Sequence, residues 1–391
     1  MKIDGHEILC ADAGYCNTYF LKLRTDEGLI GWSEFGEHTG TLGLSAVVDK
    51  LCELITGMDA LRIERVAALL HGRTIQARDG VNQQAIAAIV NALLDIKGKA
   101  LGVPVHALFG GTVRDRIPVY WSHSVAYRMM YPELMERPRV RTLDDVARVG
   151  EEARNRGIKA LKTGMVRMEG DQLFTVSQGF SSGPGFPELN LDPDALRALV
   201  KMTAALREGC GPDVDIMLDV NCHFQTEGFV RLARAVAEFD LLWLELDIFD
   251  PQALAAIRRA ASCPIASLEA IYGRAGLRPY FELDAVDVAI IDVVWNGYLE
   301  AIRMADFAAA YKINIAPHLY SGGGLGDVMS THFAAAVPNL RIMEFDFDEV
   351  PWKKTFLSAP LQLDAGEVMV PTGPGWGTEV DEAVVRAHPP R

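Results

Sequence analysis

Six acidic or basic residues recur along the second half of the chain, each at or near the end of a short β-rich run. They are Asp219, Glu245, Glu269, Asp292, His318 and Glu344, spaced at intervals of 23 to 26 residues. Because one strand with its following helix takes about 25 residues, the six side chains are expected to meet at the C-terminal mouth of a parallel barrel. Any one of them could simply cap a helix, but six in phase indicate a site.

The first three members of the series offer only carboxylate oxygens. Burying Asp219, Glu245 and Glu269 together is costly unless a cation compensates their charge. Mg²⁺ prefers a few carboxylates and keeps positions open for water and substrate. No Cys/His spacing indicates zinc. We therefore predict a magnesium site at these three residues.

His318 ends the run "INIAPH", and Asp292 ends the preceding run. On neighbouring strands the Asp292 carboxylate could accept a hydrogen bond from the imidazole, which would orient the ring and raise its basicity. A histidine after proline is often structural, but this partner favours a general base. A lysine also belongs to the mouth: in "IKALKTG" (158–164), strand alternation turns Ala160, Lys162 and Gly164 to one side.

Eight β-rich runs carry these residues. They are 117–123, 158–164, 214–221, 241–247, 264–270, 286–293, 313–318 and 341–346. With seven helical connections between them, the runs predict an α/β fold with a parallel barrel, and the strand count favours it over a doubly wound sheet. Upstream, residues 17–34 predict two strands around an Asp-Glu-Gly turn, and residues 43–101 predict helices.

Two regions interrupt the repeat. Residues 127–146 and 169–193 both follow β-rich runs and so should lie over the catalytic end of the barrel. Each could be a surface or oligomer-contact loop, or a lid or specificity loop.

The composition bounds the class of protein. The chain has 391 residues and a formal net charge of −14, which disfavours nucleic acid or an anionic membrane as a partner. The six cysteines form no C-x-x-C pair, no run is long and apolar enough for a membrane span, and the N-terminus lacks a secretion signal. We expect a cytoplasmic protein with free thiols.

Three motifs resemble the enolase superfamily, in its mandelate racemase-like branch. They are "LKLRTDEGLIGWSE", "DIKGKALGVPVHALFGG" and "VPTGPGWG", and together with the site series they cover nearly the whole chain. The resemblance implies a modified (β/α)7β TIM barrel over residues 116–355. It implies an α+β capping domain over residues 1–115, completed by residues 356–391, and a homo-oligomer.

The resemblance also implies roles. Asp219, Glu245 and Glu269 match the Mg²⁺ ligands, His318 and Asp292 match a base dyad, Glu344 matches an acid that hydrogen-bonds the enediolate, and Lys162 matches a lysine that contacts the substrate carboxylate. The chain departs from the family at Gly164, where a second lysine usually serves the opposite face. It also departs at "Glu245-Leu246-Asp247" in place of "EEP" and at "Leu268-Glu269" in place of "GE".

Two further residues follow Asp219. Asn221 takes a position that often assists carboxylate or metal binding in the family. If the strand persists, Asp219, Asn221 and His223 face the same way, and His223 is then a candidate acid. A loop histidine without a role is an equal alternative.

The implied chemistry is abstraction of a proton next to a carboxylate, followed by loss of a β-hydroxyl. Because Gly164 removes the usual second base, we expect a Mg-dependent dehydratase of an acid sugar. The alternatives are a cycloisomerase of a sugar-acid lactone or anhydro sugar acid, and then a racemase or epimerase using Tyr127, His123 or His223. Outside the superfamily, Lys162 could form a Schiff base in an aldolase, or the barrel could be a non-catalytic binding protein.

The sequence does not name the acid. Specificity is expected from cap residues 11–20 and 38–42 and from the two interrupting regions. Trp295 and Trp376 could touch substrate, but packing is the simpler expectation for both.

Overall fold

The structure is a computed structural model that describes residues 1–176, 189–221, 223–320 and 322–391. Its N-terminal part is an antiparallel sheet of three strands, β1 (Ile3–Asp12), β2 (Asn17–Thr25) and β3 (Ile30–Phe35). The helices α1 (Leu44–Ile55), α2 (Ile63–Arg73) and α3 (Gly80–Leu101) follow. The two strands and the helical region predicted from the sequence are confirmed, whereas β1 was not predicted.

A glycine sets the distance between this sheet and its helix. The long helix α3 packs against β3, and a Cβ at Gly31 would lie 2.1 Å from the Ala92 carbonyl oxygen. Only glycine permits so close an approach of strand and helix. The "GLIGW" part of the N-terminal motif therefore fixes how the sheet sits on α3.

The barrel has eight parallel strands, and all eight predicted runs contribute one. They are β4 (Arg116–Trp121), β5 (Ala160–Gly164), β8 (Asp215–Asp219), β9 (Trp243–Glu245), β10 (Ile265–Ser267), β11 (Val288–Asp292), β12 (Asn314–His318) and β13 (Met343–Phe345). Each pairs with the next as far as β12, and β13 closes the ring by pairing with β4 and lying against β12. The barrel prediction is confirmed.

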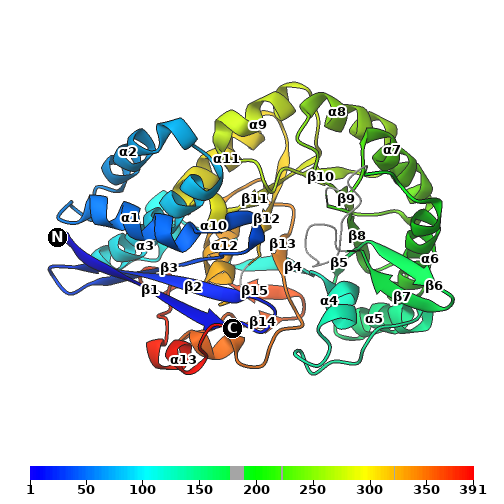
Figure 1. The fold of residues 1–391 in the computed structure, drawn as a ribbon, viewed down its shortest axis with the longest axis horizontal. Helices are drawn as coiled ribbons and strands as arrows, with labels where there is room; N and C mark the ends of the chain where they lie inside the picture. The colour runs from blue at the N-terminus through cyan, green and yellow to red at the C-terminus, as the bar shows by residue number, and fades with distance from the viewer. Residues whose placement is uncertain (177–188, 222, 321) are drawn as a thin grey trace.

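Helices surround the barrel and arc around its outer side in Figure 1. They are α4 (Ser124–Met130), α5 (Leu143–Asn155), α6 (Pro193–Cys210), α7 (Thr226–Ala235), α8 (Pro251–Ala260), α9 (Gly273–Glu282), α10 (Val293–Asn296), α11 (Tyr298–Ala310) and α12 (Leu325–Ala336). Local sequence fixes where several begin. Asp192 and Asp250 cap α6 and α8 with their carboxylates, and each is followed by a proline at the first helical position.

An apolar layer inside the barrel lies beneath the mouth. It consists of Tyr120, Ala160, Met217, Trp243, Ala266, Val288, Ile290, Ala316 and Ile342. Six of these residues lie two positions before Lys162, Asp219, Glu245, Asp292, His318 and Glu344. Because side chains alternate along a strand, the same alternation that buries this layer also aims those six functional groups inward.

The chain's end returns across both parts. The hairpin of β14 (Leu363–Asp364) and β15 (Glu367–Met369) pairs with β4, and α13 (Glu382–Ala387) lies against β1. Figure 1 shows α13 (red) below β1 and β2 (blue). The division at residues 115 and 355 stays a prediction.

The two interrupting regions have different structures. Residues 127–146 form the end of α4, a turn segment and the start of α5. Residues 169–193 continue from the hairpin of β6 (Val166–Glu169) and β7 (Gln172–Thr175), but 177–188 lie outside the described residues, as does the lid or specificity role predicted for them.

Two expectations concern the described residues alone. Within them, no helix has the length and apolar character needed to cross a bilayer. Their cysteines are all free thiols; Cys222 lies outside that part of the chain.

Candidate active site

Lys162 lies at the centre of the barrel mouth, where three carboxylates surround its ammonium group. Its Nζ is 3.1 Å from Glu245 Oε1, 3.2 Å from Glu344 Oε1 and 3.4 Å from Asp219 Oδ2. Only 3% of the lysine side chain is exposed. The structure therefore brings together four of the predicted residues, each from a different strand.

The carboxylates around Lys162 outnumber the cations. Burial, together with Asp219 and Glu344, raises the pKa of Glu245 to about 7, although Lys162 opposes the shift. Burial also opposes the charge on Glu344, but Lys162 and His318 outweigh it and lower its pKa to about 2. Burial likewise opposes the ammonium form of Lys162, but Glu245 and Glu344 outweigh it and raise its pKa. Lys162 is therefore a cation, and it does not by itself balance the three carboxylates around it.

Glu269 adds a further carboxylate. Burial raises its pKa well above the ordinary value, with Asp247 and Asp219 adding to the shift while His318 opposes it. Among the described residues, no group of three His, Cys, Asp or Glu side chains is already gathered closely enough to hold an ion. The donor set of Asp219, Glu245 and Glu269 nevertheless fits Mg²⁺ in its chemistry, because it is all oxygen, buried and in excess of the nearby positive charge.

His318 and Asp292 lie on adjacent strands in register. His318 Nδ1 is 2.6 Å from Asp292 Oδ2, and its Nε2 is 3.4 Å from Glu269 Oε2. Asp292 is itself fixed, because its other oxygen accepts a hydrogen bond from the Trp295 backbone N–H at 2.7 Å. Burial lowers the pKa of His318, but Glu269 and Asp292 outweigh it and raise the pKa to about 10. A cation held by Glu269 would weaken the first of those two interactions.

The strand that carries Glu269 breaks the alternation. β10 ends at Ser267, and Leu268, which is buried, has φ 92°, a conformation that favours glycine. Asp247 stabilises this turn: its Oδ1 accepts from Ser267 Oγ at 3.1 Å and from the Leu268 N–H at 3.2 Å. Sequence reasoning recorded both departures, Asp247 and Leu268, but missed that they contact each other.

The prediction that Asp219, Asn221 and His223 share one face depends on a strand that does not persist. β8 ends at Asp219, and Asn221 has φ 43°. A left-handed residue ends the alternation of side chains. Asn221 instead turns back, and both its backbone N–H and its Nδ2 donate to Asp219 Oδ1, at 3.0 and 2.9 Å. It positions Asp219.

His223 is buried, and neither ring nitrogen has a hydrogen-bond partner. Burial lowers its pKa, and Asp219 opposes the shift. A buried neutral imidazole without partners is a poor proton donor by itself. The structure gives His223 no contact with the dyad or with Lys162 among the described residues.

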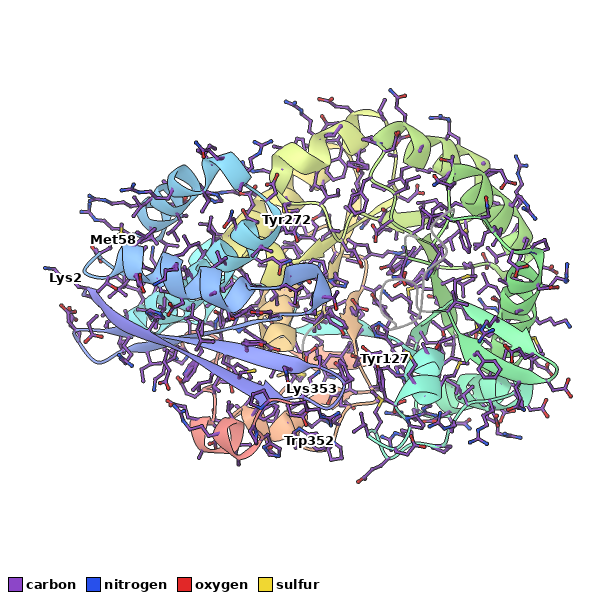
Figure 2. The ribbon with its side chains drawn as sticks, in the orientation of Figure 1. Lys2, Met58, Tyr127, Tyr272, Trp352 and Lys353 are labelled. Atoms are coloured by element: carbon purple, nitrogen blue, oxygen red, sulfur yellow. The ribbon has the colours of Figure 1, made fainter. Side chains whose placement is uncertain are left out.

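Aromatic residues from the two predicted specificity segments of the cap lie over the mouth. The Tyr15 ring is 5.1 Å from that of Tyr127 and 6.4 Å from that of Tyr320, and the His38 ring is 5.8 Å from that of Tyr320. Tyr127 belongs to α4 and is labelled in Figure 2.

The two tryptophans differ. Trp376 is buried and packs, with its Nε1 donating to the Trp32 carbonyl at 2.9 Å, as expected. The Trp295 ring is partly exposed and lies 4.8 Å from the His318 ring.

Two family models match successive parts of the chain. Residues 13–110 match the N-terminal domain of mandelate racemase / muconate lactonizing enzyme, and residues 145–384 match the family described as enolase C-terminal domain-like. A D-galactonate dehydratase family member from Streptomyces bingchenggensis is 30% identical, over 95% of this chain and 90% of the relative. A D-galactarolactone cycloisomerase from Agrobacterium fabrum is 28% identical, over 92% and 88%.

A solved structure from Burkholderia xenovorans strain LB400, named as an L-alanine-DL-glutamate epimerase, is 43% identical with a TM-score of 0.97, covering 100% of this chain and 99% of that one. A second structure under that name, bound to magnesium and fumarate, has a TM-score of 0.96 at the same identity, covering 100% and 96%. The chain is thus an enzyme of the enolase superfamily and belongs to its mandelate racemase / muconate lactonizing enzyme family.

Proposed function

We propose that the chain is a Mg²⁺-dependent dehydratase of a polyhydroxy acid. The observation that carries the proposal is the asymmetry of the mouth: a buried His–Asp pair on β12 and β11, and a glycine at the end of β5. Gly164 lies in register with Asp219, and among the described residues a Cβ there would meet only the Asp219 carbonyl oxygen, at 3.5 Å. Among the described residues packing therefore does not force the glycine, and the second base of the family is absent at a position where a Cβ would fit.

Asp219, Glu245 and Glu269 would hold the Mg²⁺. When bound, the ion supplies positive charge against the negative charge that develops on the substrate carboxylate. Asn221 orients Asp219, and the Asp247–Leu268 turn orients Glu269.

His318 takes the α-proton, since Asp292 holds its Nδ1 and leaves Nε2 for the substrate. Lys162 donates to the substrate carboxylate and stabilises the enediolate. Glu344, whose pKa is lowered to about 2, accepts rather than donates, and it holds Lys162 in place before the reaction. His223 remains a candidate acid for the departing hydroxyl, although no contact in the site supports it.

A cycloisomerase is the second candidate, since one base suffices for it and the relative from Agrobacterium fabrum carries that name. Epimerisation at a single carbon needs a base on each face, which Gly164 does not provide, despite the name of the Burkholderia structures. A Schiff-base aldolase needs a lysine with a lowered pKa, whereas that of Lys162 is raised.

The test is a panel of D-galactonate, D-xylonate, D-galactarolactone and an Ala-Glu dipeptide, incubated with the protein and MgCl₂ in D₂O. We expect an acid sugar to give a keto acid, detected with semicarbazide, and no epimer of the dipeptide. His318→Asn should lower the rate by about 10²- to 10⁴-fold. Full dehydration by H318N would show that the base is another residue, and epimerised dipeptide would favour the third candidate.

A further inference from the structure

A second His–Asp pair lies at the mouth, and the proposed function leaves it without a role. His123 follows β4, in a left-handed conformation with φ 52°. Its Nδ1 is 3.3 Å from Asp346 Oδ1 and 2.9 Å from Ser122 Oγ. Asp346 stands two residues after Glu344, on the segment that leaves β13. This pair therefore comes from the two strands that close the barrel.

Hydrogen bonds connect His123 to the centre of the site. Ser122 Oγ donates to Glu344 Oε1 at 2.5 Å, the same oxygen that lies 3.2 Å from Lys162 Nζ. The other oxygen of Glu344 accepts from the Leu319 N–H at 2.9 Å, directly after His318. Glu344 thus lies between the two His–Asp pairs, with one carboxylate oxygen toward each.

The His123 ring has partners on its face as well as at Nδ1. Tyr127 stacks on it with ring centroids 4.2 Å apart and planes 7° apart. Its Nδ1 is occupied by Asp346 and Ser122, which leaves Nε2 as the nitrogen that can exchange a proton. The side chain is 28% exposed, against 10% for His318. Burial opposes the charged ring, but Asp346 and Glu344 outweigh it and raise the pKa of His123.

We propose that His123, held by Asp346, is the acid that protonates the departing hydroxyl, a role that rests on the proposed dehydration. His318 takes the α-proton, and the β-carbon–oxygen bond breaks with its electron pair on oxygen. The hydroxyl takes a proton from Nε2 of protonated His123 and leaves as water. As the enol becomes a ketone, His318 returns its proton to the β-carbon and the enol proton restores His123. No oxidant or reductant is needed, and Gly164 requires no replacement.

The first test separates α-proton exchange from loss of water in D₂O, with MgCl₂ and the acid that the wild-type enzyme dehydrates. His123→Asn should lower water loss by about 10²-fold or more while deuterium still enters the α-position with retained configuration, because His318 is intact. Asp346→Asn should do the same more weakly. The matched control is His6→Asn, which breaks the partly buried pair with Asp49 (2.9 Å) on β1, away from the mouth, and should change neither reaction. Water loss by H123N at the wild-type rate would overturn the proposal.

The second test does not depend on turnover. In protein labelled with ¹⁵N-histidine, MgCl₂ and fumarate, the ligands of the Burkholderia structure, should shift the ring signals of both His123 and His318 but not that of His6. A shift of His318 alone would place His123 outside the substrate's reach and overturn the proposal. If neither ring responded and H318N still exchanged the α-proton, the proposed function itself would fail, and the role of His123 with it.

Discussion

Two buried carboxylates, Asp95 and Glu245, each pair with a lysine but differ in how many carboxylates share that lysine at close range. Asp95, on α3, has no exposed surface and accepts from the Trp32 N–H, the Trp376 N–H and Lys99 Nζ at 2.9, 2.9 and 2.8 Å. Asp95 therefore connects β3, α3 and the C-terminal "PGWG" segment, which belong to the three motifs of the family resemblance. We call Asp95 and the residues around it, Trp32, Lys99, His332 and Trp376, the seam. Every negative charge there has its donors.

Glu245 accepts from Trp243 Nε1 at 2.9 Å and from Lys162, yet shares that single lysine with Asp219 and Glu344. Glu269 lies beyond the reach of any described cation except the imidazole of His318. A fully paired buried network stabilises one structure, whereas an unbalanced one is costly until a cation arrives. We infer from this difference that the seam stabilises the fold, whereas the mouth is arranged to bind a cation.

The largest expected effect is at the seam. Asp95→Ala leaves two backbone N–H groups without their acceptor and takes from Lys99 its buried carboxylate partner. Removing one partner of a buried pair costs about 3–5 kcal/mol in the free energy of unfolding. Urea unfolding checks this. The control is Glu379→Gln, because Glu379 pairs with the same Lys99 at 2.6 Å but is 53% exposed; it should cost under about 1 kcal/mol. A D95A protein as stable as wild type would contradict the comparison.

The next effect is at the mouth, where a cation should stabilise the folded chain. At free Mg²⁺ about 100 times its Kd, the free energy of unfolding should rise by about 2.7 kcal/mol relative to EDTA, which a shift in Tm reports. Glu269→Gln should remove most of that gain, whereas Glu282→Gln, at a 56% exposed side chain on α9, should keep it. Equal stabilisation of E269Q and wild type would remove Glu269 from the metal site.

The residues of the mouth could be predicted from the sequence to a greater extent than those of the seam. Period-two alternation and the 23–26 residue spacing were enough to bring Lys162, Asp292 and His318 to one mouth, because strand geometry is local and repeats. The approach of Asp247 to Leu268 could not be predicted, since it depends on one left-handed residue that shifts the phase of β10. A left-handed residue, Asn221, is also the reason why the prediction that Asn221 and His223 share a face was wrong.

The contacts of the seam could not be predicted from the sequence for another reason. Asp95 and Trp376 are far apart in the chain, and nothing local to either residue marks their contact. The pair of His123 and Asp346 is equally non-local: only closure of the barrel by β13 against β4 brings it together. The strand β1 was missed because "IDGHEILCAD" mixes polar and apolar residues without a clean alternation.

A smaller effect is expected at the seam, where lowering the pH should lower the free energy of unfolding. His332 is buried, its Nε2 lies 3.1 Å from the Trp376 carbonyl oxygen, and burial lowers its pKa to about 3. The unfolded chain, with a histidine pKa near 6.5, binds the extra proton first. The free energy of unfolding therefore carries the full contribution of neutral His332 above about pH 6.5. As the pH falls from 6.5 toward 3, the free energy of unfolding decreases by about 1.4 kcal/mol per pH unit.

Urea unfolding between pH 7.5 and 5 should show that slope, and His332→Asn, although less stable at pH 7.5, should show a shallower one. The variant His6→Asn serves as the control. An unchanged slope in H332N would mean that the acid sensitivity comes from elsewhere in the chain.

The smallest effect tests whether there is space for a side-chain Cβ at Gly164. Gly164 has an ordinary φ, and an added Cβ would make only a van der Waals contact. Gly164→Ala should therefore raise the free energy of unfolding by about 0.4–1 kcal/mol, because alanine restricts the unfolded chain. The matched control is Gly209→Ala on α6, whose Cβ would lie 1.9 Å from the Ala147 carbonyl oxygen and should destabilise the protein. If G164A also destabilised it, the glycine would be required by packing, and its meaning as a missing base would be lost.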